Sequence, residues 1–384
     1  MRIFVIAGEP SGDNLGAAVM AGLKELTGGQ VTFEGVGGPA MEAEGLTSRF
    51  PMSELSVMGL AEILPKYFHL KRRIRECAEA VLADPPDLLL TIDSPDFCLR
   101  VAKLVKAKSD VRTVHYVAPT VWAWRPKRAV KMARVIDQVL ALFPFEPPLM
   151  QAAGMECDFV GHPIATQPIA TVEEVHDFRV QSGIGDAPVL LVLPGSRSGE
   201  VARLAPVFGP VLRDLRARHP ELRFVLPAAA HVAPLVEELT RDWPTGLMIL
   251  DPRDADPAEF ARIKRAAFRA ADLALAASGT VSLELAANDT PMVIAYDMAP
   301  LTRMIMQRML ITDTVTLVNL VSDTRVIPEF IGDDCDATKI APALSAVLED
   351  PTDQFEALDV TMDRLGRGGE APGLRAARAI LARL

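Results

Sequence analysis

The stretch that most constrains the fold is residues 189–201, Val-Leu-Leu-Val-Leu-Pro-Gly-Ser-Arg-Ser-Gly-Glu-Val. Its first five residues are apolar, too few for a helix and without polar alternation. This predicts a parallel strand that is buried on both faces. Pro194 and Gly195 break the strand, and apolar residues then recur at helical spacing, so a helix is expected to begin near Ser198.

The loop between this strand and this helix is suited to an anion. A strand, a small-residue loop and a helix start together aim backbone N–H groups at a phosphate. Arg197 adds a fork-shaped cationic donor at the same place. We therefore predict a phosphate site at Ser196 and Arg197. Because the loop lacks a full nucleotide fingerprint, the alternative is an ordinary turn with a surface arginine.

The chain opens with the same layout: an apolar strand at residues 3–7, a small-residue loop at 8–13, then a helix. Its 384 residues, 49% of them hydrophobic, suffice for two cores. The repetition predicts an α/β protein of two facing, doubly wound, Rossmann-like domains. A proline-containing connector at residues 159–172 divides them. We expect domains over 1–165 and 166–352, and a helical tail over 353–384 that packs back across both.

Composition excludes several classes of protein. The net charge of −10 argues against nucleic acid as a partner. The four cysteines have no paired spacing, which indicates reduced thiols rather than disulfides or a zinc site. No run is long and apolar enough to span a bilayer, and the apolar N-terminus is too short for a signal peptide. The chain is expected to be soluble or held on a membrane surface.

A dinucleotide motif at residues 35–40, Gly-x-Gly-x-x-Ala, is discounted. Gly45 follows too soon for a proper helix. No strand ending in an acid lies about twenty residues on to hold a ribose. A tight turn is expected there instead, which makes an NAD-dependent oxidoreductase a poor fit.

Two carboxylates follow a third apolar strand at residues 87–92. Ser94 and Pro95 fit a helix cap and first helical position, which places Asp96 in the first turn. Capping and the helix dipole thus explain Asp96 but not Asp93. Asp93 lies at the carboxyl end of a strand, where open α/β sheets bind ligands.

Residues 55–64 are unusually apolar for a short surface segment, and a helix is expected to begin at Pro65. Bases follow directly, and two of the three tryptophans, Trp122 and Trp124, also lie among bases. An apolar segment followed by basic residues, with tryptophans among further basic residues, is typical of a segment that lies at a membrane interface. The alternative is that the segment is core. The candidate membrane or acyl contacts are Val57, Met58, Leu60, Ile63 and Leu64.

The second half carries another apolar strand, at residues 271–277, followed by Ser278, Gly279 and Thr280. A helix comes next, so this is a second phosphate-binding helix start. Glu284, about one turn in, can accept two hydrogen bonds from ribose hydroxyls. Its alternative role is to complement the helix N-terminus. Residues 315–321 have a strand-like pattern around Asn319, an amide for which a ligand could supply partners.

The motifs together resemble one family, lipid-A-disaccharide synthase, a GT-B glycosyltransferase of outer-membrane lipid A assembly. They run in family order over nearly the whole chain, and the ordered set is highly specific. Pro10 departs from the small residue usual in the family. The matching pieces are Gly8-Glu-Pro-Ser-Gly-Asp13, Gly35-Val-Gly-Gly-Pro39, Val57-Met-Gly59, Ile92-Asp-Ser-Pro-Asp-Phe97, Tyr116-Val-Ala-Pro-Thr-Val-Trp-Ala-Trp-Arg125, Pro144-Phe-Glu146, Gly161-His-Pro163, Leu193-Pro-Gly-Ser-Arg197, Ser278-Gly-Thr280 with Glu284, and Asn319-Leu320.

The resemblance implies an inverting transfer of 2,3-diacylglucosamine from its UDP donor to 2,3-diacylglucosamine 1-phosphate, without a cofactor or a metal. It implies that Asp93 is the catalytic base, that Glu9 and Ser11 place the acceptor, and that Asn319 contacts the donor nucleotide. It also implies a peripheral location on the anionic cytoplasmic face of the inner membrane, and leaves a homodimer open.

Two other functions remain open from the sequence. A nucleotide-sugar epimerase on the same fold needs no acyl-binding surface, so lack of transfer to a lipid acceptor would favour it. A non-enzymatic membrane-surface binder needs no pair of phosphate loops in one half, so failure to bind UDP would favour it.

Overall fold

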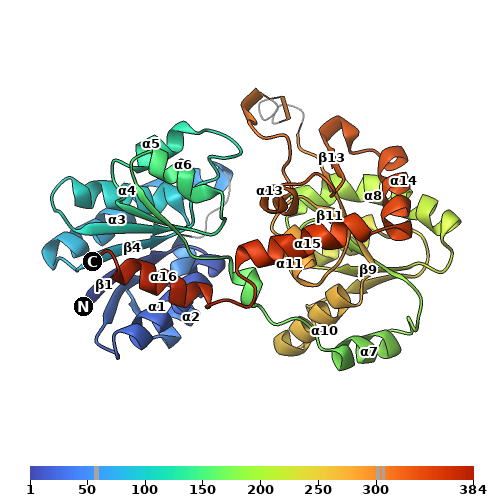
Figure 1. The fold of residues 1–384 in the computed structure, drawn as a ribbon, viewed down its shortest axis with the longest axis horizontal. Helices are drawn as coiled ribbons and strands as arrows, with labels where there is room; N and C mark the ends of the chain where they lie inside the picture. The colour runs from blue at the N-terminus through green and yellow to red at the C-terminus, as the bar shows by residue number, and fades with distance from the viewer. Residues whose placement is uncertain (56–59, 300–302, 305–307) are drawn as a thin grey trace. The chain divides into compact units, whose positions relative to one another are not determined.

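The computed structural model describes residues 1–55, 60–299, 303–304 and 308–384, and it leaves out the side chains of residues 60–66. The chain forms two compact units (Figure 1). One holds Met1–Thr166 with Leu365–Leu384, and the other holds Gln167–Arg364. The first boundary falls inside the expected connector. The expected 353–384 tail is shared, because most of its first helix belongs to the second unit and its last helix to the first.

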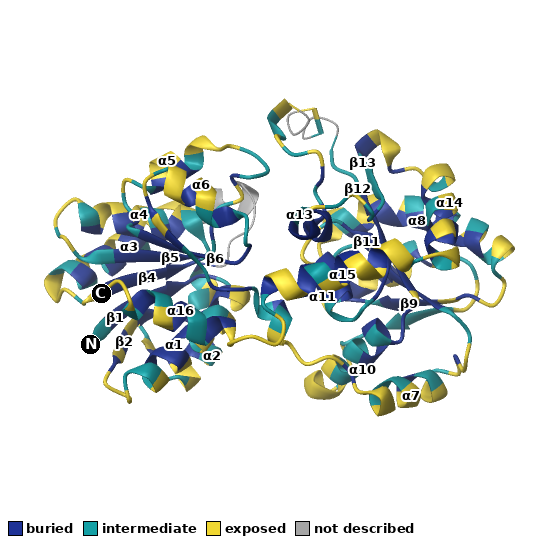
Figure 2. Cartoon of the chain, viewed as in Figure 1, coloured by how far each residue is buried: buried dark blue, intermediate teal, exposed yellow. Residues whose placement is uncertain are grey.

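The first unit is built on a seven-stranded parallel sheet in the order β3-β2-β1-β4-β5-β6-β7. Its central strands β1 and β4 are almost wholly apolar and buried, as Figure 2 shows, whereas the edge strands β3 and β7 carry polar, partly exposed residues. The strands are β1 (Arg2–Ala7), β2 (Thr32–Val36), β3 (Thr47–Ser48), β4 (Leu88–Ile92), β5 (Arg112–Tyr116), β6 (Gln138–Ala141) and β7 (Glu156–Phe159). The helices are α1 (Pro10–Leu26), α2 (Pro39–Ala43), η1 (Met52–Glu54), α3 (Leu60–Ala83), α4 (Pro95–Lys106), α5 (Lys127–Met132), α6 (Glu146–Ala152), η2 (Pro163–Thr166) and α16 (Pro372–Leu381).

The second unit repeats this plan on a six-stranded parallel sheet in the order β10-β9-β8-β11-β12-β13. Its strands are β8 (Val189–Leu193), β9 (Arg223–Pro227), β10 (Leu247–Leu250), β11 (Leu273–Ala277), β12 (Met292–Tyr296) and β13 (Glu329–Ile331). Its helices are α7 (Val172–Gln181), α8 (Ser198–Arg218), α9 (Ala233–Leu239), α10 (Pro257–Arg269), α11 (Val281–Ala287), α13 (Leu317–Ser322), η3 (Gly332–Asp334), α14 (Ala337–Glu349) and α15 (Thr352–Leu365).

Both sheets reverse their winding direction at one point, between β1 and β4 in the first and between β8 and β11 in the second. Loops that leave neighbouring strands on opposite faces open a crevice there, which is where open α/β sheets bind ligands. We call the edge where strands end the carboxyl edge and the edge where they begin the amino edge. The polar loops singled out in the sequence all follow strands that flank these two points.

The last helix, α16, packs against α1 through small residues. A Cβ on Gly373 would lie 2.6 Å from the Ala18 carbonyl oxygen, and one on Gly22 would lie 2.9 Å from the Gly373 carbonyl oxygen. Side chains larger than hydrogen would therefore push these helices apart. The glycines let the C-terminal helix lie close to α1 as part of the first unit.

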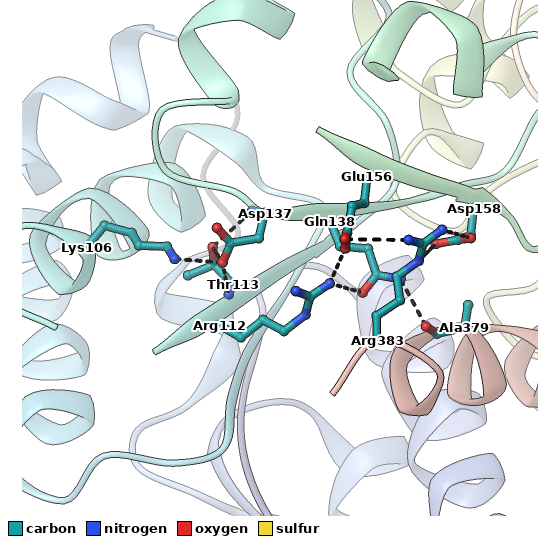
Figure 3. Close-up of polar contacts among 9 residues, drawn as sticks. All are labelled: Lys106, Arg112, Thr113, Asp137, Gln138, Glu156, Asp158, Ala379 and Arg383. Atoms are coloured by element: carbon teal, nitrogen blue, oxygen red, sulfur yellow. Dashed lines mark hydrogen bonds and ion pairs between the residues drawn. The ribbon is translucent and has the colours of Figure 1, made fainter. Parts of the chain in front are cut away.

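Polar side chains tie α16 to the amino edge of the first sheet (Figure 3). The buried Gln138 amide donates to the Ala379 carbonyl at 3.1 Å and to Asp158 at 2.8 Å. Arg383 pairs with Asp158 at 2.8 Å, and Arg112 donates to Gln138 at 3.3 Å. The Gln138 amide, the Asp158 carboxylate and the Arg383 guanidinium all have partners in this cluster, so its role is to hold the helix against the strands.

Three expectations from the sequence are wrong in detail. A short helix, α2, begins at Pro39, where a tight turn was expected. Residues 317–322 form the helix α13 rather than a strand, because an apolar run of this length fits either element. The helix expected to begin at Pro65 begins at Leu60. In contrast, α8 begins at Ser198, as predicted.

Candidate active site

A cavity of about 650 Å³ lies at the carboxyl edge of the second sheet, beside its winding reversal. The loops after β8 and β11 form two of its walls, and α10 and the loop after β9 close others. Its lining is Leu193, Gly195, Ser196, Arg197, Glu200, Pro227, Ala228, Ala229, Ala230, Pro252, Phe260, Lys264, Phe268, Ala277, Ser278, Gly279, Thr280, Val281 and Glu284. The structure thus brings six of the seven predicted donor-site residues into one hollow.

The loop after β8 does not hold its N–H groups open in this state. Glu200 Oε2 accepts the backbone N–H groups of Ser196 and Arg197 at 3.2 and 3.3 Å. Glu200 Oε1 pairs with the Arg197 guanidinium at 2.8 Å. Gly195 is required here: its φ is +110°, and a Cβ would lie 2.5 Å from Glu200 Oε2. An internal carboxylate therefore occupies the predicted anion site.

The loop after β11 contributes the other polar wall. Gly279, at φ +156°, has open space where a Cβ would point. Glu284 follows in the first turn of α11, and Lys264 from α10 donates to its Oε2 at 3.0 Å. Lys264 also lies 5.1 Å from the Phe268 ring centroid. This lysine neutralises the carboxylate that would otherwise repel a phosphate nearby.

Asn319 does not line the cavity. It is 1% exposed, donates to the Ile327 carbonyl at 3.0 Å and accepts the Ile327 N–H at 3.1 Å. Its amide also lies 3.4 Å from Thr314 Oγ1. The partners that a buried amide needs come from the chain itself, and they join α13 to the segment before β13.

In the first unit, the loops after β1 and β4 meet at the carboxyl edge. A Cβ on Gly8 would lie 2.5 Å from Ser94 Oγ, so glycine permits the two loops to touch. Glu9 precedes α1, whose first turn contains the exposed Ser11. The predicted acceptor residues and Asp93 therefore come from adjoining loops.

The backbone along this edge is strained. Asp93 and Ser94 have φ of 50° and 42°, and Val117, directly after β5, has φ 85°. A β-branched residue in this region is a clear outlier, and such strain clusters at functional sites. No hydrogen bond from the described part of the chain reaches the Asp93 carboxylate, and Ser94 Oγ is buried without a partner there.

A buried carboxyl group lies further along the same edge, at the first residue of α6, which follows β6. Glu146 is 2% exposed, and its Oε2 accepts the N–H groups of Leu142 and Phe143 at 3.1 and 3.0 Å. Burial raises the pKa of Glu146 to about 8. The Phe145 ring lies 5.5 Å from that of Trp122. In the sequence Glu146 stands out only as part of the family motif Pro144-Phe-Glu146. Its burial could not be predicted, because no sequence pattern indicates it.

The predicted membrane contacts cannot be placed. Val57 and Met58 lie outside the described residues, and the side chains of Leu60, Ile63 and Leu64 are not described. Directly after them on α3, Tyr67 and Phe68 are 44% and 81% exposed. Lys71, Arg72 and Arg75 are exposed as well. Arg73, another of the bases that follow the apolar segment, is paired with Glu54 at 2.7 Å and is only 17% exposed.

Within the described residues, no group of three or more His, Cys, Asp or Glu side chains could hold a metal ion. A search of the same residues finds no helix long and apolar enough to cross a membrane.

Solved structures share this architecture over the whole chain. The UDP-GlcNAc 2-epimerase of Neisseria meningitidis, bound to UDP-GlcNAc, has a TM-score of 0.60 at 10% identity, covering 100% of this chain and 99% of that one. The calicheamicin glycosyltransferase has a TM-score of 0.57 at 15% identity, with 99% and 97% covered. The two parallel sheets thus form a GT-B fold, the class that includes glycosyltransferases and UDP-sugar epimerases, and the predicted fold class is confirmed.

The sequence comparisons narrow the class to a family. The profile described as lipid-A-disaccharide synthetase matches residues 3–371. The lipid-A-disaccharide synthase of Ruegeria pomeroyi is 64% identical, covering 100% of this chain and 96% of its own length. That of Rhodospirillum centenum is 45% identical, covering 99% and 94%. The chain belongs to the lipid-A-disaccharide synthase family and is a glycosyltransferase, which confirms the resemblance carried by the motifs.

Proposed function

We propose that the enzyme transfers 2,3-diacylglucosamine from UDP to 2,3-diacylglucosamine 1-phosphate, with inversion, and releases UDP and a β-linked tetraacyl disaccharide 1-phosphate. Family membership supports the sugar, lipid and nucleotide classes. The observation that carries the proposal is the chemistry at the two winding reversals. One holds a cavity lined by the small-residue loops after β8 and β11, and the other holds the Asp93 carboxylate, to which no described residue donates a hydrogen bond.

The cavity of the second unit takes the donor. The loops after β8 and β11 bind the diphosphate, and Arg197 stabilises the charge that develops on the leaving UDP. Glu284 accepts the ribose hydroxyls through the oxygen that Lys264 leaves free. Asn319 acts indirectly, since its amide is already satisfied and its role is to fix α13.

The carboxyl edge of the first unit takes the acceptor. Asp93 is the general base that removes the proton of the attacking sugar hydroxyl. Glu9 and Ser11, on the adjoining loop, position the acceptor. The strained backbone at Asp93 supports this role, because strain at such a residue persists only where the surrounding structure holds it.

The test of the reaction is incubation with UDP-diacylglucosamine and the acylated sugar phosphate, followed by mass spectrometry. We expect UDP and disaccharide in equal amounts. An epimerised UDP-sugar formed without acceptor would contradict the proposal and favour the epimerase alternative. A chain that fails to bind UDP would contradict it in favour of a non-enzymatic surface binder.

The donor site has a test of its own. Arg197→Ala should weaken UDP binding by about tenfold or more, because a charge-assisted phosphate contact is worth roughly 1.5–3 kcal/mol. Arg218→Ala, at the far end of α8 and paired with Asp214, is the matched control and should bind UDP normally. Calorimetry that finds wild-type affinity in Arg197→Ala would show that the site is misplaced.

We further propose that α3 and the segment before it hold the enzyme on the cytoplasmic face of an anionic inner membrane. The exposed Phe68, beside Lys71, Arg72 and Arg75, supports this. An aromatic residue among bases suits the interface, and each base near an anionic leaflet contributes about 1 kcal/mol, screened by salt. Glu54, at the end of η1, pairs with both His69 and Arg73 of α3, which joins η1 to α3.

Vesicle co-sedimentation tests the membrane proposal. Two variants should bind anionic vesicles less well than the wild type and keep a melting temperature near its value. One carries Ser in place of Val57, Met58, Leu60 and Ile63, and the other carries Ser in place of Phe68 alone. Val180→Ser, at a position 62% exposed on α7, is the matched control. If the variant with all four substitutions melts far below the wild type, the segment is part of the core, since each large-to-small replacement in a core lowers the free energy of unfolding by roughly 2–5 kcal/mol.

A further inference from the structure

Glu200 holds the same donors that a diphosphate needs. Its carboxylate accepts two backbone N–H groups of the loop after β8 and pairs with the Arg197 guanidinium, at 3.2, 3.3 and 2.8 Å. These are the contacts expected for a phosphate at a helix N-terminus with an arginine beside it. The Glu200 side chain is only 14% exposed, whereas Arg197 is 66% exposed on the cavity wall.

Helix capping alone does not account for this arrangement. A glutamate at the third helical position ordinarily reaches back to one backbone N–H, here that of Arg197. Glu200 also takes the N–H of Ser196 and the guanidinium, neither of which belongs to the helix. Gly195 makes the close approach possible, because any Cβ there would collide with the carboxylate.

We propose that Glu200 is an internal competitor of the donor diphosphate. In the empty enzyme it keeps the loop in its anion-binding shape and neutralises Arg197. When the donor arrives, phosphate oxygens take over the N–H groups and the guanidinium, and Glu200 turns away. When UDP leaves, Glu200 recovers these contacts, which speeds product release. This rests on the proposed function, since it requires a nucleotide diphosphate in the cavity.

The competitor role and a simple positioning role predict opposite signs for one variant. Glu200→Gln can still accept the backbone N–H groups and cap the helix, but it has no charge to hold Arg197. If Glu200 competes, UDP binds about tenfold tighter to the variant. If Glu200 only aims Arg197 at the phosphate, UDP binds more weakly.

Titration calorimetry with UDP on the full-length wild type and Glu200→Gln is the experiment. Asp214→Asn, which breaks an ion pair on the same helix far from the cavity, is the matched control and should bind like the wild type. In turnover, Glu200→Gln should show a lower inhibition constant for UDP and a lower kcat, because UDP leaves more slowly. The melting temperature should stay near the wild-type value.

A double-mutant cycle tests whether this tightening acts through Arg197. In an Arg197→Ala background, Glu200→Gln should tighten UDP binding less than it does beside an intact Arg197, because the guanidinium is no longer contested. UDP that binds equally or more weakly to Glu200→Gln would overturn the inference. A wild type that does not bind UDP would instead overturn the proposed function.

Discussion

The two edges of the first sheet have opposite character. At the amino edge, Gln138, Asp158 and Arg383 satisfy one another and lock α16 in place. At the carboxyl edge, the backbone at Asp93 and Val117 is strained, and Ser94 Oγ is buried without a partner in the described chain. The difference separates two tasks: polar groups at the amino edge stabilise the fold, and those at the carboxyl edge are the groups that the proposed function assigns to a ligand.

The largest expected effect is on turnover, at Asp93 on the carboxyl edge. Asp93→Asn keeps the shape and removes the basic oxygen, so turnover should fall by about 100-fold or more, while UDP affinity and the melting temperature stay unchanged. Asp96→Asn is the matched control: Asp96 is exposed in the first turn of α4, and its loss should cost less than about 1 kcal/mol of stability and little activity. Near-normal turnover in Asp93→Asn would remove it as the base.

The opposite result is expected at the amino edge. Gln138→Leu leaves the Ala379 carbonyl and Asp158 without a buried partner, so the free energy of unfolding should fall by about 1–3 kcal/mol. Turnover of the folded variant should match the wild type. Urea unfolding with a parallel activity assay measures both quantities, and a variant that keeps its stability but loses turnover would contradict the division between the edges.

A pH dependence of stability follows from Glu146. Burial raises the pKa of Glu146 in the folded state to about 8 from its ordinary value of 4.5, so the folded state binds a proton that the unfolded state releases between these values. Its contribution to stability is therefore full below about pH 4.5 and is lost as the pH rises towards 8. The melting temperature should fall by on the order of 5 °C across this window. In Glu146→Gln this part of the slope should be absent; an equal slope in both proteins would contradict the assignment.

The smallest expected effect is on the free energy of unfolding, when the residues at the two ends of β5 are replaced by glycine. Val117, directly after the strand, has φ 85°, and Val111, directly before it, does not have a positive φ; both are half-buried. Val117→Gly relieves strain and should raise the free energy of unfolding by up to about 1 kcal/mol, whereas Val111→Gly should lower it by about 1 kcal/mol. Equal losses in chemical denaturation would mean that the carboxyl edge stores no strain at this residue.

Much of this arrangement could be predicted from the sequence, because it depends on local pattern. Apolar runs followed by small-residue loops marked the strands and helix starts, and so located Arg197, Thr280 and Asp93 near the ends of strands. Composition and the repeated layout gave the two Rossmann-like units. These features depend on neighbours in the chain, which the sequence displays directly.

The remainder depends on contacts between distant segments. Lys264 reaches Glu284 from another helix, and nothing in the sequence pairs these two residues. A ligand was one possible source of partners for the Asn319 amide, yet the backbone of Ile327 supplies them. The contacts of Glu200 with Ser196 and Arg197 are local, since these residues lie only four and three positions earlier in the chain. They still could not be predicted, because they depend on the rotamer of the Glu200 side chain. The capping-box spacing is the one signal that could have indicated it.

The configuration of the new glycosidic bond tests the proposed inverting transfer most directly. It is determined by NMR of the product formed from UDP-diacylglucosamine and the acylated sugar phosphate. If an acceptor hydroxyl activated by Asp93 displaces UDP in one step, the bond is β and one UDP is released for each disaccharide. An α-linked product, or UDP released with free diacylglucosamine in place of disaccharide, would contradict it.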